Sequence, residues 1–79
     1  MNPFRRRERA QPRVVLYSKP ECSLCDDARA MLDRMGVTYE VVRDPAFDLR
    51  MPVVEVAGRI VTEGRVSERA VALAVRKGR

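Results

Sequence analysis

The sequence predicts an α/β domain in which helices pack on a small mixed β-sheet. An apolar run at residues 14–17, a helical pattern at 26–35 and an alternating strand pattern at 37–43 follow one another. This β-α-β order implies two parallel strands joined by a right-handed crossover. A turn signal at Gly58 lies between two further strand patterns and adds an antiparallel pair. The 79 residues allow one domain with a thin core.

The first two predicted elements are a buried strand and an amphipathic helix. Val14 to Tyr17 is a run of β-forming residues typical of a central strand. The helix is predicted from Asp26 to Met35, where apolar residues recur at i, i+3, i+4 and i+7. Negative charge in its first turn suits the helix dipole, and Gly36 stands where a left-handed C-cap is expected.

Three more strands follow, with one incomplete helix between them. The second strand is predicted at residues 37–43 and is ended by Asp44-Pro45. Residues 46–50 are long enough for one helical turn only. The third strand is predicted at 52–56 and the fourth at 60–63, joined by a tight hairpin at Ala57-Gly58 or Gly58-Arg59.

The last element is a helix that Ser67 is predicted to cap. Val66 and Val71 have the spacing of a hydrophobic staple across that cap. Val71, Ala74 and Val75 then form the face expected to be buried.

The net charge of +5 is concentrated at the two ends of the chain, because residues 14–75 hold eight basic and ten acidic residues. Residues 1–12 are predicted to form a flexible basic arm, and residues 13–79 the folded domain. A basic arm can bind nucleic acid or anionic lipid. No nucleic-acid-binding motif follows it, so nucleic acid is not expected as a partner. The protein is also expected to be a monomer.

No segment approaches the ~20 apolar residues of a membrane span. The basic N-terminus also lacks the apolar stretch and cleavage site of a signal peptide. We therefore expect no membrane association and a cytoplasmic location, where two close cysteines indicate a catalytic or metal-binding role rather than a structural disulfide.

Cys22 and Cys25 are the only cysteines, and they stand between the first strand and the first helix. A C-x-x-C pair near a β-α-β pattern is a redox signature. A bridge across so short a loop stabilises a fold weakly. A structural zinc site needs four ligands, usually Cys or His, and the chain has no histidine and no other cysteine, so no metal is expected. Two unreactive thiols remain the structural alternative.

The spacing of the two cysteines suits a disulfide if Cys22 caps the helix and Cys25 lies in its first turn. The free N–H groups there would stabilise a Cys22 thiolate, which makes Cys22 the nucleophile and Cys25 the resolving thiol. Glu21, Asp26 and Asp27 oppose this effect through like charge. We expect the Cys22 pKa near the upper end of the ~3.5–7.5 range of activated thiols, and a protein that reduces disulfides rather than forming them.

The run from Val14 to Cys25 resembles the opening of a glutaredoxin-like protein of the thioredoxin fold. Met51-Pro52-Val53-Val54 resembles the strand of that family that begins with a cis-proline, and the resemblance covers about residues 13–76. It implies a thioredoxin-like, four-stranded mixed sheet with two main helices. The helix between strands two and three is reduced to Asp44–Arg50 or absent, which would expose Phe47 and Leu49.

The resemblance also implies roles for individual residues. Cys22 is the nucleophile and Cys25 the resolving thiol, and Pro52 is cis and lies beside the disulfide. The Met51 backbone pairs with the partner peptide or thiol substrate. Lys19 stands where the family holds a carboxylate of glutathione, although it also fits an ordinary surface lysine, and Pro52 also fits a trans proline that starts an edge strand.

The thiol-binding set implied by the resemblance further includes Ser23, Leu24, Gly64, Arg65 and Ser67. Leu24 occupies the third position of the cysteine tetrad, where the family usually has an aromatic residue. Gly64 keeps one glycine of the family's glutathione-binding pair, whereas Arg65 replaces the second. N–H groups near Ser67 could still hold a carboxylate.

The resemblance implies a thiol–disulfide oxidoreductase that reduces protein disulfides or glutathione mixed disulfides through a dithiol cycle. No bound cofactor is expected, and glutathione or another low-molecular-weight thiol is the candidate co-substrate. The implied partners are a disulfide-bearing protein and a reductant, either glutathione or thioredoxin reductase. Two alternatives remain: a non-enzymatic binding module of the same fold, and a dedicated electron donor to one enzyme such as ribonucleotide reductase.

Overall fold

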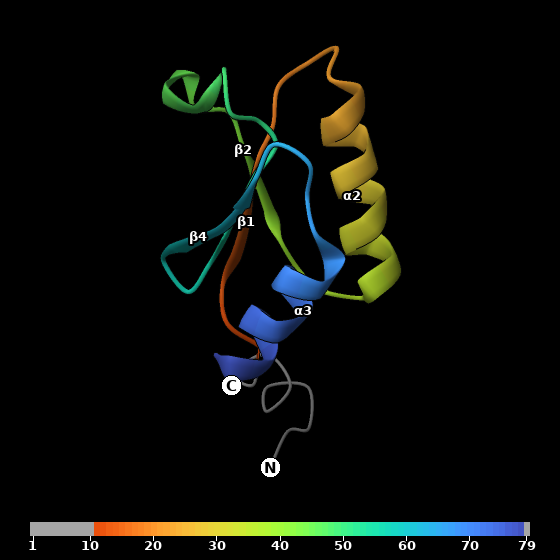
Figure 1. The fold of residues 1–79 in the computed structure, drawn as a ribbon, viewed down its shortest axis with the longest axis vertical. Helices are drawn as coiled ribbons and strands as arrows, with labels where there is room; N and C mark the ends of the chain where they lie inside the picture. The colour runs from red at the N-terminus through yellow and green to blue at the C-terminus, as the bar shows by residue number, and fades with distance from the viewer. Residues whose placement is uncertain (1–10, 79) are drawn as a thin grey trace.

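A computed structural model describes residues 11–78 (Figure 1). The elements are, in chain order, β1 (Val14–Tyr17), α2 (Ser23–Met35), β2 (Glu40–Val42), a 3₁₀ turn η1 (Pro45–Phe47), β3 (Val53–Val56), β4 (Arg59–Glu63) and α3 (Glu68–Lys77). No helix within the described range is both long enough and apolar enough to cross a membrane.

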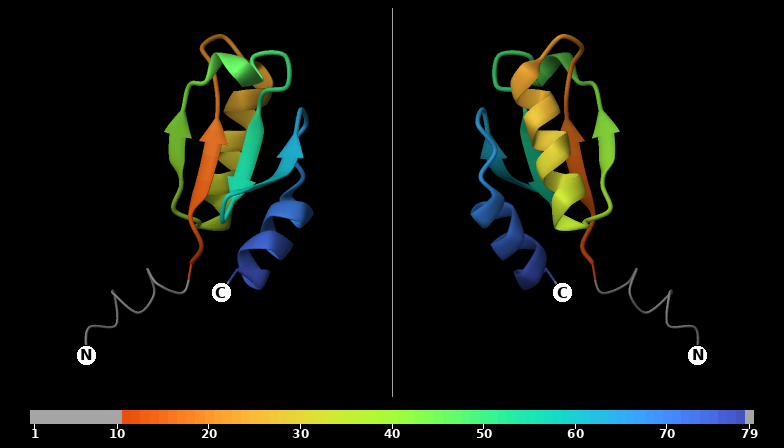
Figure 2. Two further views of the ribbon diagram at one scale, coloured as in Figure 1. Left: turned by 90° about the vertical axis from the view of Figure 1, so that its left-hand side faces the viewer. Right: turned by 90° about the vertical axis from the view of Figure 1, so that its right-hand side faces the viewer.

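The four strands form one mixed sheet in the order β2-β1-β3-β4. β1 pairs in parallel with β2 and antiparallel with β3, and β3 pairs antiparallel with β4. Figure 2 shows α2 lying across one face of this sheet, with α3 on the same side at the end nearer β4. The predicted thioredoxin-like fold, with two main helices and a mixed sheet, is confirmed.

The core lies between the sheet and the two helices. Its buried members are apolar side chains of β1, β3, α2 and α3, which pack into one cluster: Val14, Leu16, Ala28, Met31, Leu32, Val54, Val56, Val71 and Val75. The predicted apolar stripe of the first helix and the predicted buried face of the last helix therefore both point into this cluster, with Met35 and Ala74 packed at its edge.

The first helix starts three residues earlier than predicted, at Ser23. Cys22 is its N-cap, so the two cysteines belong to the helix terminus rather than to a loop that precedes it. Gly36 ends the helix with φ 73°, in the left-handed conformation that the sequence predicts there.

The second strand is shorter than the predicted 37–43 and covers only Glu40–Val42. At Thr38 the backbone forms hydrogen bonds with the Gln11 side chain instead of with a neighbouring strand. The Thr38 N–H donates to Gln11 Oε1 (2.9 Å), and Gln11 Nε2 donates to the Thr38 carbonyl (2.7 Å). Residues 1–10 of the predicted basic arm lie outside the described residues.

The β3–β4 hairpin turns at Ala57 and Gly58, the first of the two predicted positions. Both residues have positive φ, 53° and 81° respectively. Two consecutive residues with positive φ are typical of the type I′ turn, whose twist matches that of the flanking strands. β4 consequently starts at Arg59, one residue earlier than predicted, and β3 starts at Val53, after Pro52.

Residues 44–50 form only η1 and a short turn, on the sheet face opposite α2 (Figure 1). Asp44 caps the turn by accepting the Ala46 N–H at 3.0 Å. Phe47 is half-buried, because its ring packs on Tyr17 with centroids 4.5 Å apart. Leu49 is 101% exposed. The expected exposure is therefore observed for Leu49, whereas Tyr17 covers part of Phe47.

Replacing the cap of α3 is expected to weaken the fold measurably. Ser67 Oγ accepts the Ala70 N–H at 3.2 Å, and Val71 is fully buried beside it. Ser67→Ala should lower the free energy of unfolding by about 1 kcal/mol, a fall of roughly 4–8 °C in the melting temperature. Thermal denaturation followed by circular dichroism measures the change. Ser67→Asp, which keeps a capping oxygen, is the matched control, and an equal loss in both variants would contradict the capping role.

Candidate active site

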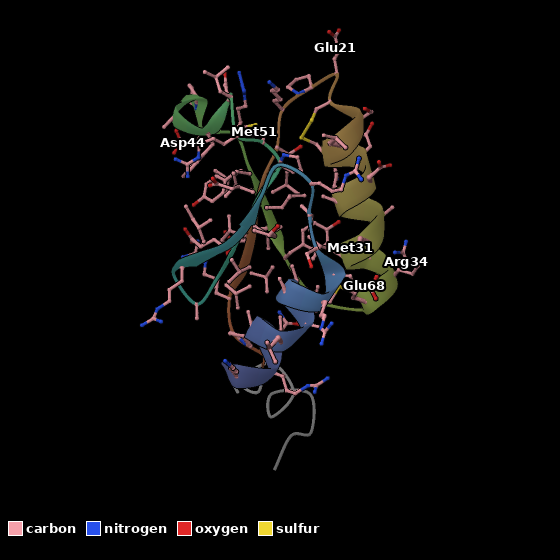
Figure 3. The ribbon with its side chains drawn as sticks, viewed as in Figure 1. Glu21, Met31, Arg34, Asp44, Met51 and Glu68 are labelled. Carbon is pink, nitrogen blue, oxygen red and sulfur yellow. A yellow bond between two sulfur atoms is a disulfide. The ribbon has the colours of Figure 1, made fainter. Side chains whose placement is uncertain are left out.

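Cys22 and Cys25 form a disulfide at the N-terminus of α2 (Figure 3). Their Cα atoms are 5.2 Å apart, which lies within the range of ordinary disulfides. Cys22 has extended backbone dihedrals as the N-cap, and Cys25 lies in the first turn of the helix. This is the arrangement that the spacing predicts, because the cap position brings the two side chains closer than they would be within a helix.

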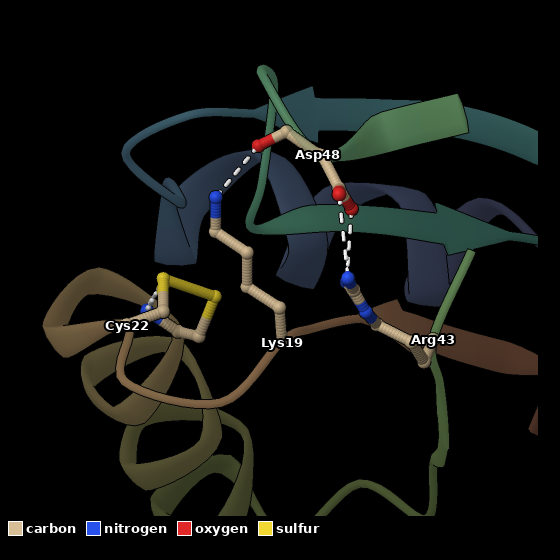
Figure 4. Close-up of a disulfide and its surroundings, with 5 residues drawn as sticks. Lys19, Cys22, Arg43 and Asp48 are labelled. Atoms are coloured by element: carbon tan, nitrogen blue, oxygen red, sulfur yellow. Dashed lines mark hydrogen bonds and ion pairs between the residues drawn. A yellow bond between two sulfur atoms is a disulfide. The ribbon is translucent and has the colours of Figure 1, made fainter. Parts of the chain in front are cut away.

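The two cysteines differ in exposure and in hydrogen bonding. Cys25 is fully buried, whereas Cys22 is half-buried. The Cys25 backbone N–H donates to Cys22 Sγ at 3.2 Å (Figure 4). An N–H group at a helix N-terminus stabilises negative charge, so it would favour a Cys22 thiolate once the disulfide is reduced. Cys22 is therefore the more accessible cysteine and accepts a hydrogen bond at its sulfur, whereas Cys25 is enclosed by the fold.

Lys19 extends from the loop before the cysteines towards η1. Its Nζ donates to the Asp48 carbonyl at 2.9 Å, while the Asp48 carboxylate pairs with Arg43 at 2.9 Å (Figure 4). Among residues 11–78, no carboxylate lies within ion-pair distance of the Lys19 ammonium group. The lysine thus links the two loops at this end of the molecule, and no described carboxylate pairs with its ammonium group.

The Met51-Pro52 peptide bond is cis, as the resemblance implies. Both residues are buried, and they directly precede β3. Figure 3 shows Met51 at the same end of the domain as the disulfide. Pairing of the Met51 backbone with a substrate remains a prediction.

The other predicted thiol-binding residues lie in two places. Ser23 and Leu24 are exposed in the first turn of α2, with Leu24 41% exposed. Gly64 follows β4 with φ 73°, and its N–H donates to the Arg50 carbonyl at 2.8 Å. Arg65 is exposed, and Ser67 is the N-cap of α3.

A shallow groove of about 360 Å³ brings Leu24 and Arg65 together, although they come from different predicted elements. Met31 of α2 and Glu68 of α3 line the same groove. Met31 and Glu68 were not among the site residues predicted from the sequence. The spacing of residues 24, 28 and 31 along one helix face is the signal that could have found the floor of the groove.

Three carboxylates stand near the cysteines in the sequence, and all three are exposed: Glu21, Asp26 and Asp27. None of them forms an ion pair within the described range. Glu21 has φ 56° and projects from the tip of the loop into solvent (Figure 3). Asp26 lies in the first turn of α2, where the helix dipole favours its charge.

Two groups with displaced pKa values lie on the sheet face opposite α2. Partial burial, followed by the nearby Glu55 carboxylate, raises the pKa of Tyr17, whose hydroxyl donates to Glu55 at 3.2 Å. The hydrogen bond and charge of Arg13 lower the pKa of Glu40.

A second depression of about 380 Å³ lies around Gln11, before β1 begins. Since β1 separates that depression from the cysteines, it has no part in the thiol site.

A family model for glutaredoxins matches residues 14–59. The match runs from the first residue of β1 to the first residue of β4, and it includes both cysteines and the cis-proline. It covers more than half of the 79 residues. No curated protein sequence matches the chain.

Proposed function

The chain belongs to the glutaredoxin family, and we propose that it reduces protein disulfides or glutathione mixed disulfides through Cys22 and Cys25. The observation that carries this proposal is the asymmetry of the pair at the N-terminus of α2. Cys22 caps the helix, is partly accessible and accepts the Cys25 N–H, whereas Cys25 is fully buried. A thiolate that is accessible and stabilised by an N–H group is the reactive form of a cysteine.

The reaction is a two-step thiol–disulfide exchange. The Cys22 thiolate attacks one sulfur of the substrate disulfide, forms a mixed disulfide with it and releases the other sulfur as a thiolate. Cys25 then attacks Cys22 Sγ, and its proton passes to the second departing sulfur. The thiolate released first takes a proton from solvent, so the substrate gains two electrons and becomes two thiols, and the protein is left with the Cys22–Cys25 disulfide.

A reductant must return the disulfide to the dithiol form. We assign this role to glutathione or thioredoxin reductase, in a reducing compartment such as the cytoplasm. Lys19 supports glutathione as one candidate, because its ammonium group has no carboxylate partner among the described residues. Gly64, Arg65 and Ser67 would lie towards the other end of such a thiol.

The experiment is a reduction assay with insulin and with hydroxyethyl disulfide. Each substrate is tested with glutathione and glutathione reductase, and separately with thioredoxin reductase, using NADPH consumption as the readout. Wild-type protein is expected to turn over at least one substrate, and the double variant Cys22→Ser/Cys25→Ser none. Equal background rates for wild type and the double variant with every reductant would exclude the enzymatic function. The active reductant identifies the electron source.

A further inference from the structure

The groove lined by Leu24 and Arg65 has an apolar floor. Leu24, Ala28 and Met31 recur along one face of α2, and Val66 faces them from the segment before α3. Neither cysteine lines the groove, but Leu24 immediately precedes the resolving Cys25, so the groove starts one residue along the chain from the redox pair. Because Ala28 and Met31 are part of the core, the floor has a fixed position relative to the two sulfurs.

The groove extends away from the disulfide along α2. Arg34 and Glu68 line its far end, where Arg34 Nη2 lies 3.3 Å from Glu68 Oε1. Figure 3 shows Met31, Arg34 and Glu68 close together between α2 and α3. From Leu24 to Arg34 the helix rises roughly 15 Å, at about 1.5 Å per residue. An extended peptide of about four or five residues covers that length.

Arg34 and Glu68 pair with each other, which leaves two other charged side chains in the lining of the groove. Arg65 stands on the wall that precedes α3, and Asp27 on the wall formed by α2. Neither side chain has an ion-pair partner among residues 11–78. Arg65 therefore offers a guanidinium group to a carboxylate on a bound segment, and Asp27 disfavours the same carboxylate on the opposite wall.

We propose that this groove binds the protein segment that flanks the target cysteine, with an apolar side chain on the floor and an acidic side chain at Arg65. This inference rests on the proposed reductase function and names its substrate class as a protein disulfide. Leu24 is the groove residue nearest to the two cysteines in the chain, so a segment whose cysteine is bonded to Cys22 would enter the groove across Leu24.

Glutathione fits this groove less well than a protein segment does. It consists of glutamate, cysteine and glycine, and therefore has no apolar side chain to cover Leu24 and Val66. It is also only three residues long, whereas the groove continues to the Arg34–Glu68 pair. An apolar floor gains free energy only when apolar surface is removed from water. The occupant that this floor selects therefore has an apolar residue beside its cysteine.

The test uses disulfide-linked dimers of three short, acetylated and amidated peptides with a central cysteine. In the first peptide leucines flank the cysteine and glutamates lie outside them. The second replaces the glutamates with lysines, and the third replaces the leucines with serines. Reduced protein is mixed with each dimer, and the second-order rate of peptide thiol release is measured. One dimer releases two thiols as the protein dithiol becomes the Cys22–Cys25 disulfide.

Arg65→Glu is compared with Arg69→Glu, a matched control that has the same change in charge on an exposed position outside the groove lining. The measured quantity is the ratio of the rates for the glutamate and lysine peptides. This ratio cancels differences in active fraction and in folding between the proteins. Arg65→Glu should lower the ratio by roughly two-fold or more, given about 1.4- to five-fold per exposed ion pair and opposite effects on the two peptides. Arg69→Glu should keep the wild-type ratio.

The apolar floor is tested by the serine peptide, which should react about ten-fold more slowly than the leucine peptide with wild-type protein. Equal rates for these two peptides, or equal changes of the ratio in Arg65→Glu and Arg69→Glu, would overturn the groove proposal. Failure of the reductase function itself is distinct, because the wild type would then release no thiol from any disulfide, hydroxyethyl disulfide included.

Discussion

Cys22→Ser is expected to lower disulfide reduction by more than about 10³-fold, to the background rate, because it removes the sulfur that we propose as the nucleophile. A serine hydroxyl at the same cap still accepts the Cys25 N–H, so helix α2 keeps its first turn. The remaining Cys25 is fully buried and cannot replace Cys22 as the attacking group. Insulin reduction and hydroxyethyl disulfide reduction both measure the loss.

Cys25→Ser is the matched comparison, and its expected behaviour differs in kind. Cys22 can still attack a disulfide, but no second thiol is present to release the substrate, so a mixed disulfide should accumulate. Intact-mass spectrometry detects this adduct after incubation with a small disulfide, and cyanylation or tryptic mapping locates it on Cys22. An adduct that accumulates on Cys25 in the Cys22→Ser variant would reverse the two assigned roles.

Much of the fold could be predicted from the sequence because it depends on local patterns. The stripe that contains Ala28 and Leu32 has the period of a helix, and Gly58 permits the positive φ of the hairpin turn. Residues 37–39 were predicted wrongly as strand. Their alternating pattern is that of a strand, but Gln11, 27 residues from Thr38 in the chain, supplies side-chain hydrogen bonds in place of a neighbouring backbone. A contact of that kind has no local signal.

The candidate site likewise contains residues that could be predicted from the sequence and residues that could not. Cys22, Cys25 and Pro52 could be found from the sequence because a short motif marks each of them, and the cap position follows from the spacing of the cysteines. The groove could not be found, because Leu24 and Arg65 meet only when α2 packs beside the segment before α3. Hydrophobic patterns indicate that two helices have buried faces, but not which exposed residues become neighbours at the edges of those faces.

The reduced segment between β2 and β3 shows how the fold compensates for a helix it lacks. The Phe47 ring covers Tyr17, and the Arg50 guanidinium lies 5.0 Å from the centre of the Phe47 ring and pairs with Glu63 at 3.0 Å. Two strand residues on this face, Val15 and Val53, are buried despite having no helix above them. A small aromatic and charged cluster thus covers the sheet, and most of the buried apolar area must come from the other face.

That dependence on one face makes Leu16 a sensitive position of the core. It lies in the central strand β1, between β2 and β3, and is fully buried against the helices. Leu16→Ala removes this packing and should lower the free energy of unfolding by about 2–5 kcal/mol. A domain of this size has roughly 4–12 kcal/mol in total, at about 0.05–0.15 kcal/mol per residue. The melting temperature should therefore fall by at least about 10 °C.

Leu49→Ala and Leu73→Ala make the same chemical change at exposed positions, 101% and 48% accessible respectively. Each should alter the free energy of unfolding by less than about 0.5 kcal/mol, because neither side chain is enclosed by the core. Urea denaturation followed by circular dichroism compares the three variants, and unchanged m-values would show that the effect lies in the folded state. If Leu16→Ala were no more destabilising than the two surface variants, the helix-covered face would not be what holds this domain together. The helix-free face around Phe47 and Tyr17 would then have to supply the missing stability.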